Sequence, residues 1–435
     1  MTTYRLFGAT SGSATPQSFA GNFISGMVFT VTKGGMWFQG YWWWVCPTGQ
    51  STSPVKCALW SVKDGSGNGV VISGTVVTSG ALTAGQWNFI PLATPVQIAI
   101  GDTLVAAVGC NGNFPDLLNW WAANGPNGLA NGPLFGYGPN TNQGGTSYFN
   151  GGGGNPWTVP QGCFSTGGSD PSLVMPFSIS GTDNFCVDVQ VSDTAPAGYS
   201  GSYRLWPNMA AADNMTNGDS AVPYIYGVEI DLSQACTLNK VWFYSGSGSF
   251  SLPTSADVWS VNAGGVTGTN AATNAAPAWK LPNGSAAAAG GGWVYTAMPA
   301  TTLPAGKYRV SAYDSNGASG TGGSKRLGYW GLEGTENAQA VTGANGITNG
   351  PMTAPIPANA ATCYDFQTNS PGTPTPTFTD PGQSVFQVGP PNSYPNLYVG
   401  PSSPGGALFQ NYWVDMEVTP VPVTASGGAA LLVPA

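Results

Sequence analysis

Short runs of alternating hydrophobic and polar residues recur along the chain and predict β-strands. Residues 185–191 read Phe-Cys-Val-Asp-Val-Gln-Val, and residues 412–418 read Tyr-Trp-Val-Asp-Met-Glu-Val. In both runs every second side chain is apolar, which is the period of a strand with one buried face. Residues 241–244, 255–259 and 307–313 are further β-rich runs bounded by Gly, Pro, Ser and Asn. Because no stretch of helical periodicity competes with them, we expect an all-β chain.

The sequence also repeats itself in order. Tyr4-Arg5-Leu6-Phe7 returns as Tyr203-Arg204-Leu205-Trp206, and Leu59-Trp60-Ser61-Val62 returns as Val258-Trp259-Ser260-Val261, both 199 residues later. Three later blocks keep the order: 101–108 with 306–313, 127–134 with 345–352, and 184–191 with 411–418. An ordered series of this kind predicts an internal duplication.

The duplication divides the chain into two copies. We predict two tandem antiparallel β-sandwich (jelly-roll-like) domains, the first over residues 1–191 and the second over residues 203–418. Residues 192–202 form a linker rich in Ser, Ala, Gly and Pro, and residues 419–435 form a C-terminal tail. Trp60 and Trp259 are expected at equivalent core positions of the two sandwiches.

The amino-acid composition supports this fold and argues against nucleic-acid binding and histidine-dependent chemistry. Of 435 residues, 42% are hydrophobic, and Gly (64) and Pro (36) are frequent, which favours a buried core, strands and turns. The 11 basic and 19 acidic residues form no basic surface for a nucleic acid. The chain has no histidine, which excludes Ser-His-Asp and Cys-His catalysis and zinc sites that need histidine.

The seven cysteines show no Cys-x-x-Cys spacing, so we expect no metal and no redox site. Buried free thiols are the plainer interpretation, although Cys46 and Cys57 are close enough in sequence to pair across a hairpin. Residues 1–7 lack the basic and apolar segments of a secretory signal, which predicts synthesis in a cytoplasm. No apolar run approaches the roughly 20 residues of a membrane helix, so we expect no membrane partner.

The repeated blocks resemble an uncharacterised β-sandwich domain family found in virion proteins of actinobacterial phages and in exported actinobacterial multidomain proteins. The resemblance is carried by strand patterns of the second copy: Val241-Trp-Phe-Tyr244, Val258-Trp259-Ser260, the Trp293 strand, Leu303 to Tyr308, and Asn411 to Val418. In the first copy Cys186 stands where Trp413 does, and Trp43-Trp44 stand where Phe243-Tyr244 do. The resemblance implies a fold and a setting, the virion, and its motifs carry no chemistry.

Two groups of tryptophans are candidate contact residues. In the run Tyr41-Trp42-Trp43-Trp44, successive side chains point to opposite faces, so either Trp43 or the pair Trp42 and Trp44 faces outward. An outward indole either stacks on a sugar ring or is covered by a neighbouring domain or subunit. Trp120 and Trp121, shortly after Asp116, pose the same choice between glycan contact and a loop anchored on its own apolar residues.

The carboxylates and the C-terminal tail give weaker indications. Asp188 and Asp415 recur at one point of the two copies, where a hydrogen-bonding role is favoured over a calcium ligand because calcium takes 6 to 8 oxygens. Nothing in the spacing of the acidic residues nominates the pair that a glycosidase needs. Leu431, Leu432 and Val433 end a tail that either docks on another subunit or is a disordered terminus.

The sequence therefore predicts a non-enzymatic structural protein of a tailed-phage virion, without catalytic residues, metal or cofactor. A minor tail or tail-tip protein is the first interpretation, and a capsid-surface decoration or head-fibre protein is the alternative placement. Its expected partners are other virion proteins, further copies of itself in a homo-oligomer, and a glycan of the host surface. A carbohydrate-binding module of a cell-surface protein and a depolymerising glycosidase remain as rival hypotheses.

Overall fold

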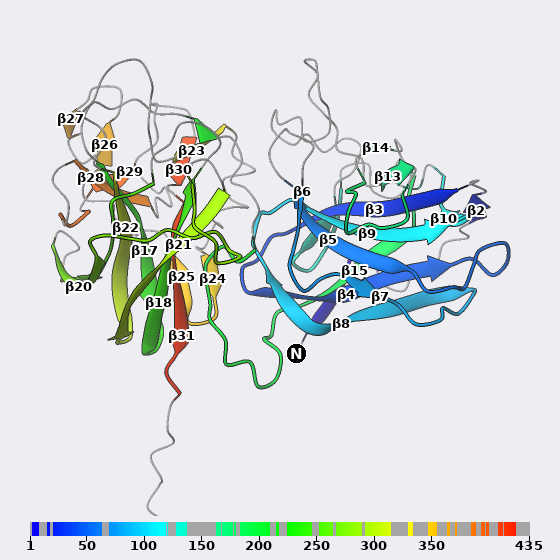
Figure 1. Cartoon of the computed structure of the whole chain (residues 1–435), viewed down its shortest axis with the longest axis horizontal. Coiled ribbons are helices and arrows are strands. Elements are labelled where there is room, and N and C mark those ends of the chain that lie inside the picture. The colour runs from blue at the N-terminus through cyan, green and yellow to red at the C-terminus, as the bar shows by residue number, and fades with distance from the viewer. Residues whose placement is uncertain are drawn as a thin grey trace, which may run out of the picture.

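The structure of the chain is a computed structural model. It describes residues 2–7, 15–17, 21–62, 69–118, 120, 128–136, 162–166, 168–176, 178–179, 183–208, 215–216, 224–245, 252–263, 267–288, 292–314, 329–333, 347–354, 363–365, 370–371, 384–388, 393–395, 397–399, 408–411 and 413–422. Every regular element in this part is a β-strand (Figure 1). The prediction of an all-β chain built from antiparallel sheets is therefore confirmed.

Two sheets form the N-terminal half. The smaller has the order β1 (Thr3–Arg5), β15 (Val187–Ser192), β4 (Met36–Val45) and β8 (Gln86–Ile98). The larger has the order β11 (Leu129–Asn131), β12 (Leu134–Gly136), β3 (Asn22–Val31), β9 (Leu104–Asn111), β5 (Lys56–Val62) and β6 (Gly69–Val71), with β7 (Val77–Thr78), β13 (Gly162–Thr166) and β14 (Ser178–Ile179) attached. A separate pair joins β2 (Thr15–Gln17) to β10 (Phe114–Asp116).

The C-terminal half is built in the same way. Its smaller sheet has the order β21 (Gly292–Leu303), β18 (Cys236–Ser245) and β31 (Val414–Pro420). Its larger sheet runs β20 (Gly268–Asn274), β19 (Ser255–Val261), β22 (Gly306–Asp314), β17 (Tyr224–Leu232), β28 (Ser384–Val388), β29 (Leu397–Val399), β26 (Cys363–Asp365) and β27 (Ser370–Pro371), with β24 (Ile347–Asn349) and β25 (Met352–Ala354) beside β17. A third sheet joins β16 (Met215–Thr216), β23 (Tyr329–Glu333) and β30 (Leu408–Asn411).

Each half has a hydrophobic core between its two main sheets. In the first half Phe29 and Leu104 of the larger sheet share a buried cluster with Trp43 and Val189 of the smaller one. In the second half Val228 and Val310 share a cluster with Phe243 and Met416. The alternation that predicted strands thus buries one face of each sheet against the other, as in a β-sandwich.

The strand pairings of the two halves correspond, which supports the predicted duplication. In the larger sheets the order β12-β3-β9-β5-β6 is matched by β25-β17-β22-β19-β20. In the smaller sheets β15-β4-β8 is matched by β31-β18-β21, and the place of β1 is taken by Tyr203, which forms a bridge with Val418. β31 continues to Pro420, so the strand extends two residues beyond the predicted end of the second copy.

Trp60 and Trp259 occupy equivalent register positions, but these lie on the outer face of the larger sheet instead of in the core between the sheets. Trp60 is opposite Val105, and Trp259 is opposite Arg309. Both tryptophans are buried under other segments; Trp60 packs with Met175, and Trp259 lies beside Tyr394. The inward residues Leu104, Ala106 and Val108 correspond to Tyr308, Val310 and Ala312, which shifts the predicted match of 101–108 with 306–313 by one position.

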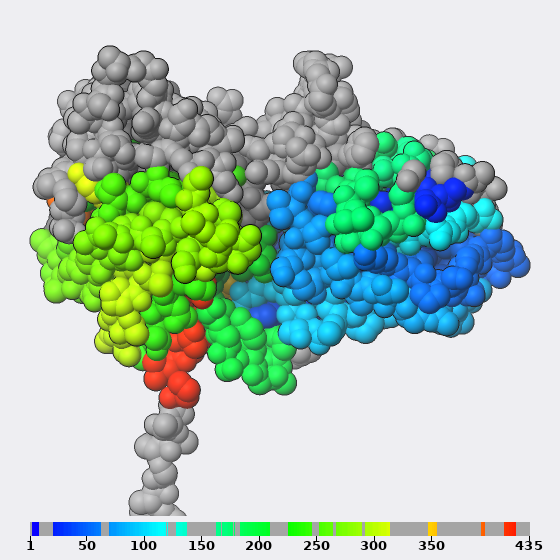
Figure 2. All heavy atoms as spheres, in the orientation of Figure 1, coloured from blue at the N-terminus to red at the C-terminus, as the bar shows by residue number. Residues whose placement is uncertain are grey.

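The two halves lie side by side and contact each other (Figures 1 and 2). Ala99 and Ile100 of the first half belong to the buried cluster of the second half. At the same place the Asn349 amide donates to Gln97 Oε1 (3.1 Å), and the Asn208 amide donates to the Gln97 carbonyl (2.8 Å). The two sandwiches therefore share buried contacts as well as a linker.

Six of the seven cysteines have described side chains, and these form no disulfide with one another. They are Cys46, Cys57, Cys110, Cys163, Cys186 and Cys236, and all six are buried. A disulfide between Cys46 and Cys57, the weaker of the two predicted states, is therefore absent, because Cys46 packs with Trp44 while Cys57 lies in the core between the sheets. Burial raises the pKa of the Cys110 thiol to about 12, which keeps this thiol protonated.

Candidate functional site

The tryptophan run of β4 presents its indoles to two different environments. Trp43 faces the core between the sheets and has no exposed surface. Trp42 and Trp44 face the outer side of the smaller sheet, which resolves the choice left open by the sequence. Trp44 is 8% exposed and packs against Cys46, Cys186 and the Trp87 ring at 5.9 Å.

Trp42 is covered by groups of its own chain. The Arg5 guanidinium lies 3.8 Å from the centre of the Trp42 ring, and the Phe89 ring packs at 4.9 Å. The indole Nε1 of Trp42 donates to Gln190 Oε1 at 3.1 Å. The outward indole of Trp42 is partly buried, and the groups that pack on it come from its own chain.

Asp188 fastens the N-terminal segment to the sandwich. Its carboxylate has no exposed surface and accepts hydrogen bonds from the backbone N–H groups of Leu6 (2.9 Å) and Phe7 (3.2 Å). It also pairs with Arg5 at 3.3 Å. Burial raises the pKa of Asp188 to about 6, while Arg5 and the backbone donors act in the opposite direction.

The second half repeats this arrangement. Asp415 accepts from the backbone of Leu205 and Trp206, both at 3.1 Å, and pairs with Arg204 at 3.4 Å. The Arg204 guanidinium lies 3.8 Å from the centre of the Trp242 ring. Asp188 and Asp415 therefore have the hydrogen-bonding role that the sequence favoured over a calcium ligand.

A third repeated block meets the same cluster in each half. The Asn131 amide donates to the Arg5 carbonyl at 2.6 Å, and the Asn349 amide donates to the Arg204 carbonyl at 2.5 Å. The following residues, Gly132 (φ 59°) and Gly350 (φ 58°), have a left-handed backbone. A Cβ there would lie 2.4 Å from the Tyr4 ring or 2.2 Å from the Tyr203 ring, so glycine is required.

We call these two assemblies the chain-end clusters. Their members in the first half are Tyr4, Arg5, Trp42, Asn131, Gly132 and Asp188; in the second they are Tyr203, Arg204, Trp242, Asn349, Gly350 and Asp415. Three of the five repeated blocks thus meet at one place in each half: 4–7, 127–134 and 184–191 in the first, and 203–206, 345–352 and 411–418 in the second. The described contacts of the chain-end clusters are internal to the chain.

Trp120 packs against apolar residues of its own half. Its ring packs edge-on against Phe7 at 5.2 Å and lies partly buried on the core of the first half. Trp121 lies outside the described residues. Asp116, four residues before Trp120, is 5% exposed, and its Oδ1 has no hydrogen-bond partner in the part of the chain that the structure describes. Burial, with a contribution from Asp183, raises the pKa of Asp116 to about 7.

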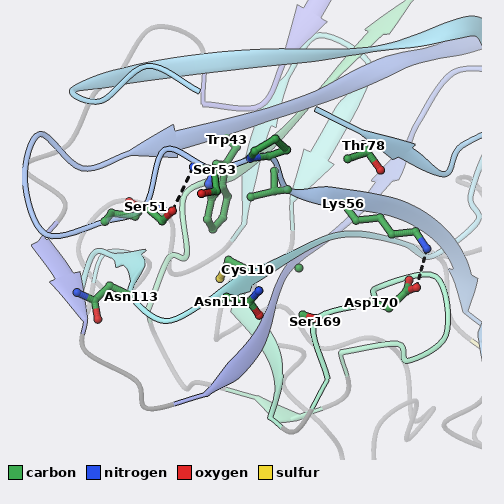
Figure 3. Close-up of a pocket in the computed structure, with 14 residues that line it drawn as sticks. Trp43, Ser51, Ser53, Lys56, Thr78, Cys110, Asn111, Asn113, Ser169 and Asp170 are labelled. Atoms are coloured by element: carbon green, nitrogen blue, oxygen red, sulfur yellow. Dashed lines mark hydrogen bonds and ion pairs between the residues drawn. The ribbon is translucent and has the colours of Figure 1, made fainter. Parts of the chain in front are cut away.

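A polar cleft opens at one end of the first sandwich, beside β5 and β9 (Figure 3). Its volume is about 340 Å³. It is lined by Trp43, Gln50, Ser51, Ser53, Pro54, Val55, Lys56, Thr78, Gly109, Cys110, Asn111, Asn113, Ser169 and Asp170. This is the size of a small-molecule site, and hydroxyl, amide and charged groups surround it.

The two charges of the cleft neutralise each other. Lys56 Nζ donates to Asp170 Oδ2 at 2.6 Å, and this hydrogen bond, together with one from Ser172, lowers the pKa of Asp170. Inside the cleft lies Trp43, whose indole Nε1 is buried and has no hydrogen-bond partner among the described residues. The sequence analysis named Trp43 as a contact residue but did not predict the cleft, because the lining residues come from five separate segments that share no motif.

The described residues contain no group of three or more Cys, Asp or Glu side chains able to hold a metal ion. Within the same part of the chain no helix is long and apolar enough to cross a membrane. Leu431, Leu432 and Val433 lie outside the described residues, so their predicted docking stays a prediction.

Comparison with known proteins adds no family to this picture. A scan against protein-family models gives no match, and a search of curated proteins gives none either.

Proposed function

We propose that the protein is a structural component of the virion of a tailed phage, a minor tail or tail-tip protein, with a capsid-surface or head-fibre position as the alternative placement. The setting comes from the resemblance of the repeated blocks. The observation that carries the structural role is the repeated chain-end cluster, in which Arg5, Asp188, Arg204 and Asp415 all serve to fix the chain to its own sandwich. These repeated residues of the chain-end clusters thus stabilise the fold.

The proposal includes the absence of enzymatic activity. Most buried carboxylates of the described part have partners that suit a structural role: Glu229 binds Arg309 and Lys307, and Asp257 binds Ser255 and Thr273. Asp116 differs from these carboxylates, because one of its oxygens has no hydrogen-bond partner among the described residues. The test is release of reducing sugar from host envelopes by the purified chain. Activity that disappears in Asp116→Asn would contradict the proposal.

Mass spectrometry of purified virions of the encoding phage tests the placement. We expect peptides of the chain at a fixed copy number that persists through density-gradient purification. A non-structural protein of the same phage serves as the control and should disappear during purification. If the peptides of the chain disappear during purification together with those of the control, the virion hypothesis is contradicted.

A carbohydrate-binding module is the second candidate, and the cleft beside β5 and β9 favours it. This candidate predicts a protein that binds cell-wall polysaccharide as a monomer, whereas a virion component is expected to form a stable oligomer. Light scattering of the purified chain separates the two states.

A further inference from the structure

We propose that the cleft of the first half is a binding site for one neutral sugar unit, held mainly by hydrogen bonds. This deepens the proposed function, since it names the glycan contact of a virion-surface protein. It also moves that contact away from the outer face of β4, where Arg5 and Phe89 cover Trp42.

The chemistry of the lining selects the ligand class. Hydroxyl and amide side chains both donate and accept, as sugar hydroxyls do; Ser53, Thr78 and Asn111 are exposed examples. Because Lys56 and Asp170 already neutralise each other, an anionic or cationic ligand would have to break their ion pair. A neutral polyhydroxy ligand can instead bond to both groups while the pair stays intact.

Trp43 supplies an unsatisfied donor at the same place. A buried N–H without a partner costs free energy that a ligand oxygen recovers on binding. The Trp43 indole has no exposed surface, lines the cleft, and its Nε1 lacks a partner among the described residues. Because the indole has no exposed surface, a sugar hydroxyl can accept from this N–H only when a lining residue beside Trp43 moves aside.

Hydrogen bonds to the backbone preform both walls of the cleft. On one wall the Cys46 N–H donates to Gln50 Oε1 at 2.7 Å, which closes the turn before Ser51. On the other, the Trp60 indole donates to the Pro171 carbonyl at 2.8 Å and holds the segment that carries Asp170. A preformed polar site loses little entropy when a small ligand binds.

Gly109 allows the segment that carries Ser169 and Asp170 to lie directly against β9. A Cβ on Gly109 would lie 1.9 Å from the Ser169 carbonyl oxygen. Gly109 is opposite Lys56 in the sheet, and the corresponding pair in the second half is Tyr313 opposite Ser255. The second half therefore has neither the glycine nor the lysine that this cleft uses.

The second half fills the corresponding corner with its own chain. Phe243 stands in place of Trp43, since Trp43 lies between Asn88 and Val187 and Phe243 between Val294 and Val414. Trp279 packs 6.1 Å from Phe243 and donates to the Pro253 carbonyl at 2.7 Å. Pro253 corresponds to Pro54, a lining residue of the cleft, because the two residues are separated by the same 199 positions as the first repeated blocks. Among the described residues the cleft is thus found in the first half, whereas the chain-end clusters are found in both.

The test uses the purified full chain and saturation-transfer NMR. The neutral probes are methyl α-mannopyranoside, methyl β-galactopyranoside and N-acetylglucosamine; the charged probes are galacturonate and glucosamine. We expect saturation of at least one neutral probe and weaker saturation of both charged ones. A preference for a charged probe, or no saturation of any neutral probe, overturns the proposal.

Two variants locate the binding. Trp43→Phe, which places the second-half residue in the cleft, should raise the Kd of the neutral sugar about fivefold through loss of one hydrogen bond. Ser53→Leu copies Leu252 at the rim and should abolish binding by filling the space, without touching the core. Ser73→Leu, at an exposed serine of the same half outside the cleft, is the matched control and should bind as the parent does.

Equal binding by the Ser53→Leu and Ser73→Leu variants overturns the assignment to the cleft, even if Trp43→Phe fails to fold. Because the probes are free sugars and the protein is purified, this result is independent of virion mass spectrometry. The sugar-binding proposal and the virion proposal can therefore be contradicted independently of each other.

Discussion

The two halves agree at the smaller sheet and differ at one end of the sandwich. Around Asp188 and Asp415 the same residue types make the same contacts, with the Arg guanidinium 3.8 Å from the tryptophan ring in both halves. At the end near β5 and β19, one half has a polar cleft and the other has Trp279 packed near Phe243. The shared chain-end clusters fix the start of each half to its own sandwich. The cleft, which differs between the halves, is the feature to which we assign a binding function.

The largest effect is expected when the shared carboxylates are removed. Asp188→Ala and Asp415→Ala should each lower the free energy of unfolding by about 3–5 kcal/mol, because each leaves a partly buried arginine and two buried backbone N–H groups without their acceptor. Urea denaturation measures the loss. Asp193→Ala, at a carboxylate near the surface at the start of the linker, should have a much smaller effect. A small effect at either buried position would show that the clusters are not equivalent.

Trp279→Ala tests the difference between the halves. Removing this buried indole should cost about 3 kcal/mol, because a cavity remains beside Phe243. Trp279→Phe keeps most of the volume and should recover part of the loss. If the alanine variant is as stable as the parent in urea denaturation, Trp279 does not fill the corner of the second half.

Replacement of the stacked arginines tests the cation–π part of the clusters. Arg5→Lys and Arg204→Lys keep the charge but lose the flat guanidinium over the ring, which should cost about 1–2 kcal/mol in each half. Thermal unfolding of the two variants compares them directly. If only one of the two variants loses stability, the arginine–tryptophan stacking stabilises only that half.

Asp116 gives a pH dependence of stability to the first half. Its pKa rises from 3.8 to about 7 on folding, so the folded chain binds the proton more tightly. Its contribution is present at low pH and is lost as the pH rises through about 7. Asp116→Asn should therefore be more stable than the parent at pH 8 by about 1 kcal/mol, after allowance for solvent screening. Equal stability of the two proteins at pH 8 would contradict the raised pKa.

Much of the fold was predictable because repetition and alternation are local signals. Residues 185–191 showed the strand face that carries Val187 and Val189 into the core. The sequence could not show that Tyr4, Asn131 and Asp188 meet, because this requires the pairing of β1 with β15 and of β12 with β3. The cleft was hidden for the same reason. Its donor, Trp43, was visible, but the Lys56–Asp170 ion pair joins residues 114 positions apart.

The position of the chain ends has a mechanical consequence. Thr3 pairs with Ser192, and Tyr203 pairs with Val418, so each half is entered and left on neighbouring antiparallel strands. Force applied along the chain would load these backbone hydrogen bonds one after another and peel the first strand away. In the first half the peeling stops at Leu6 and Phe7, where the buried Asp188 carboxylate holds two N–H groups at once. We therefore expect the carboxylates, and not the strand edges, to set the force at which each half opens.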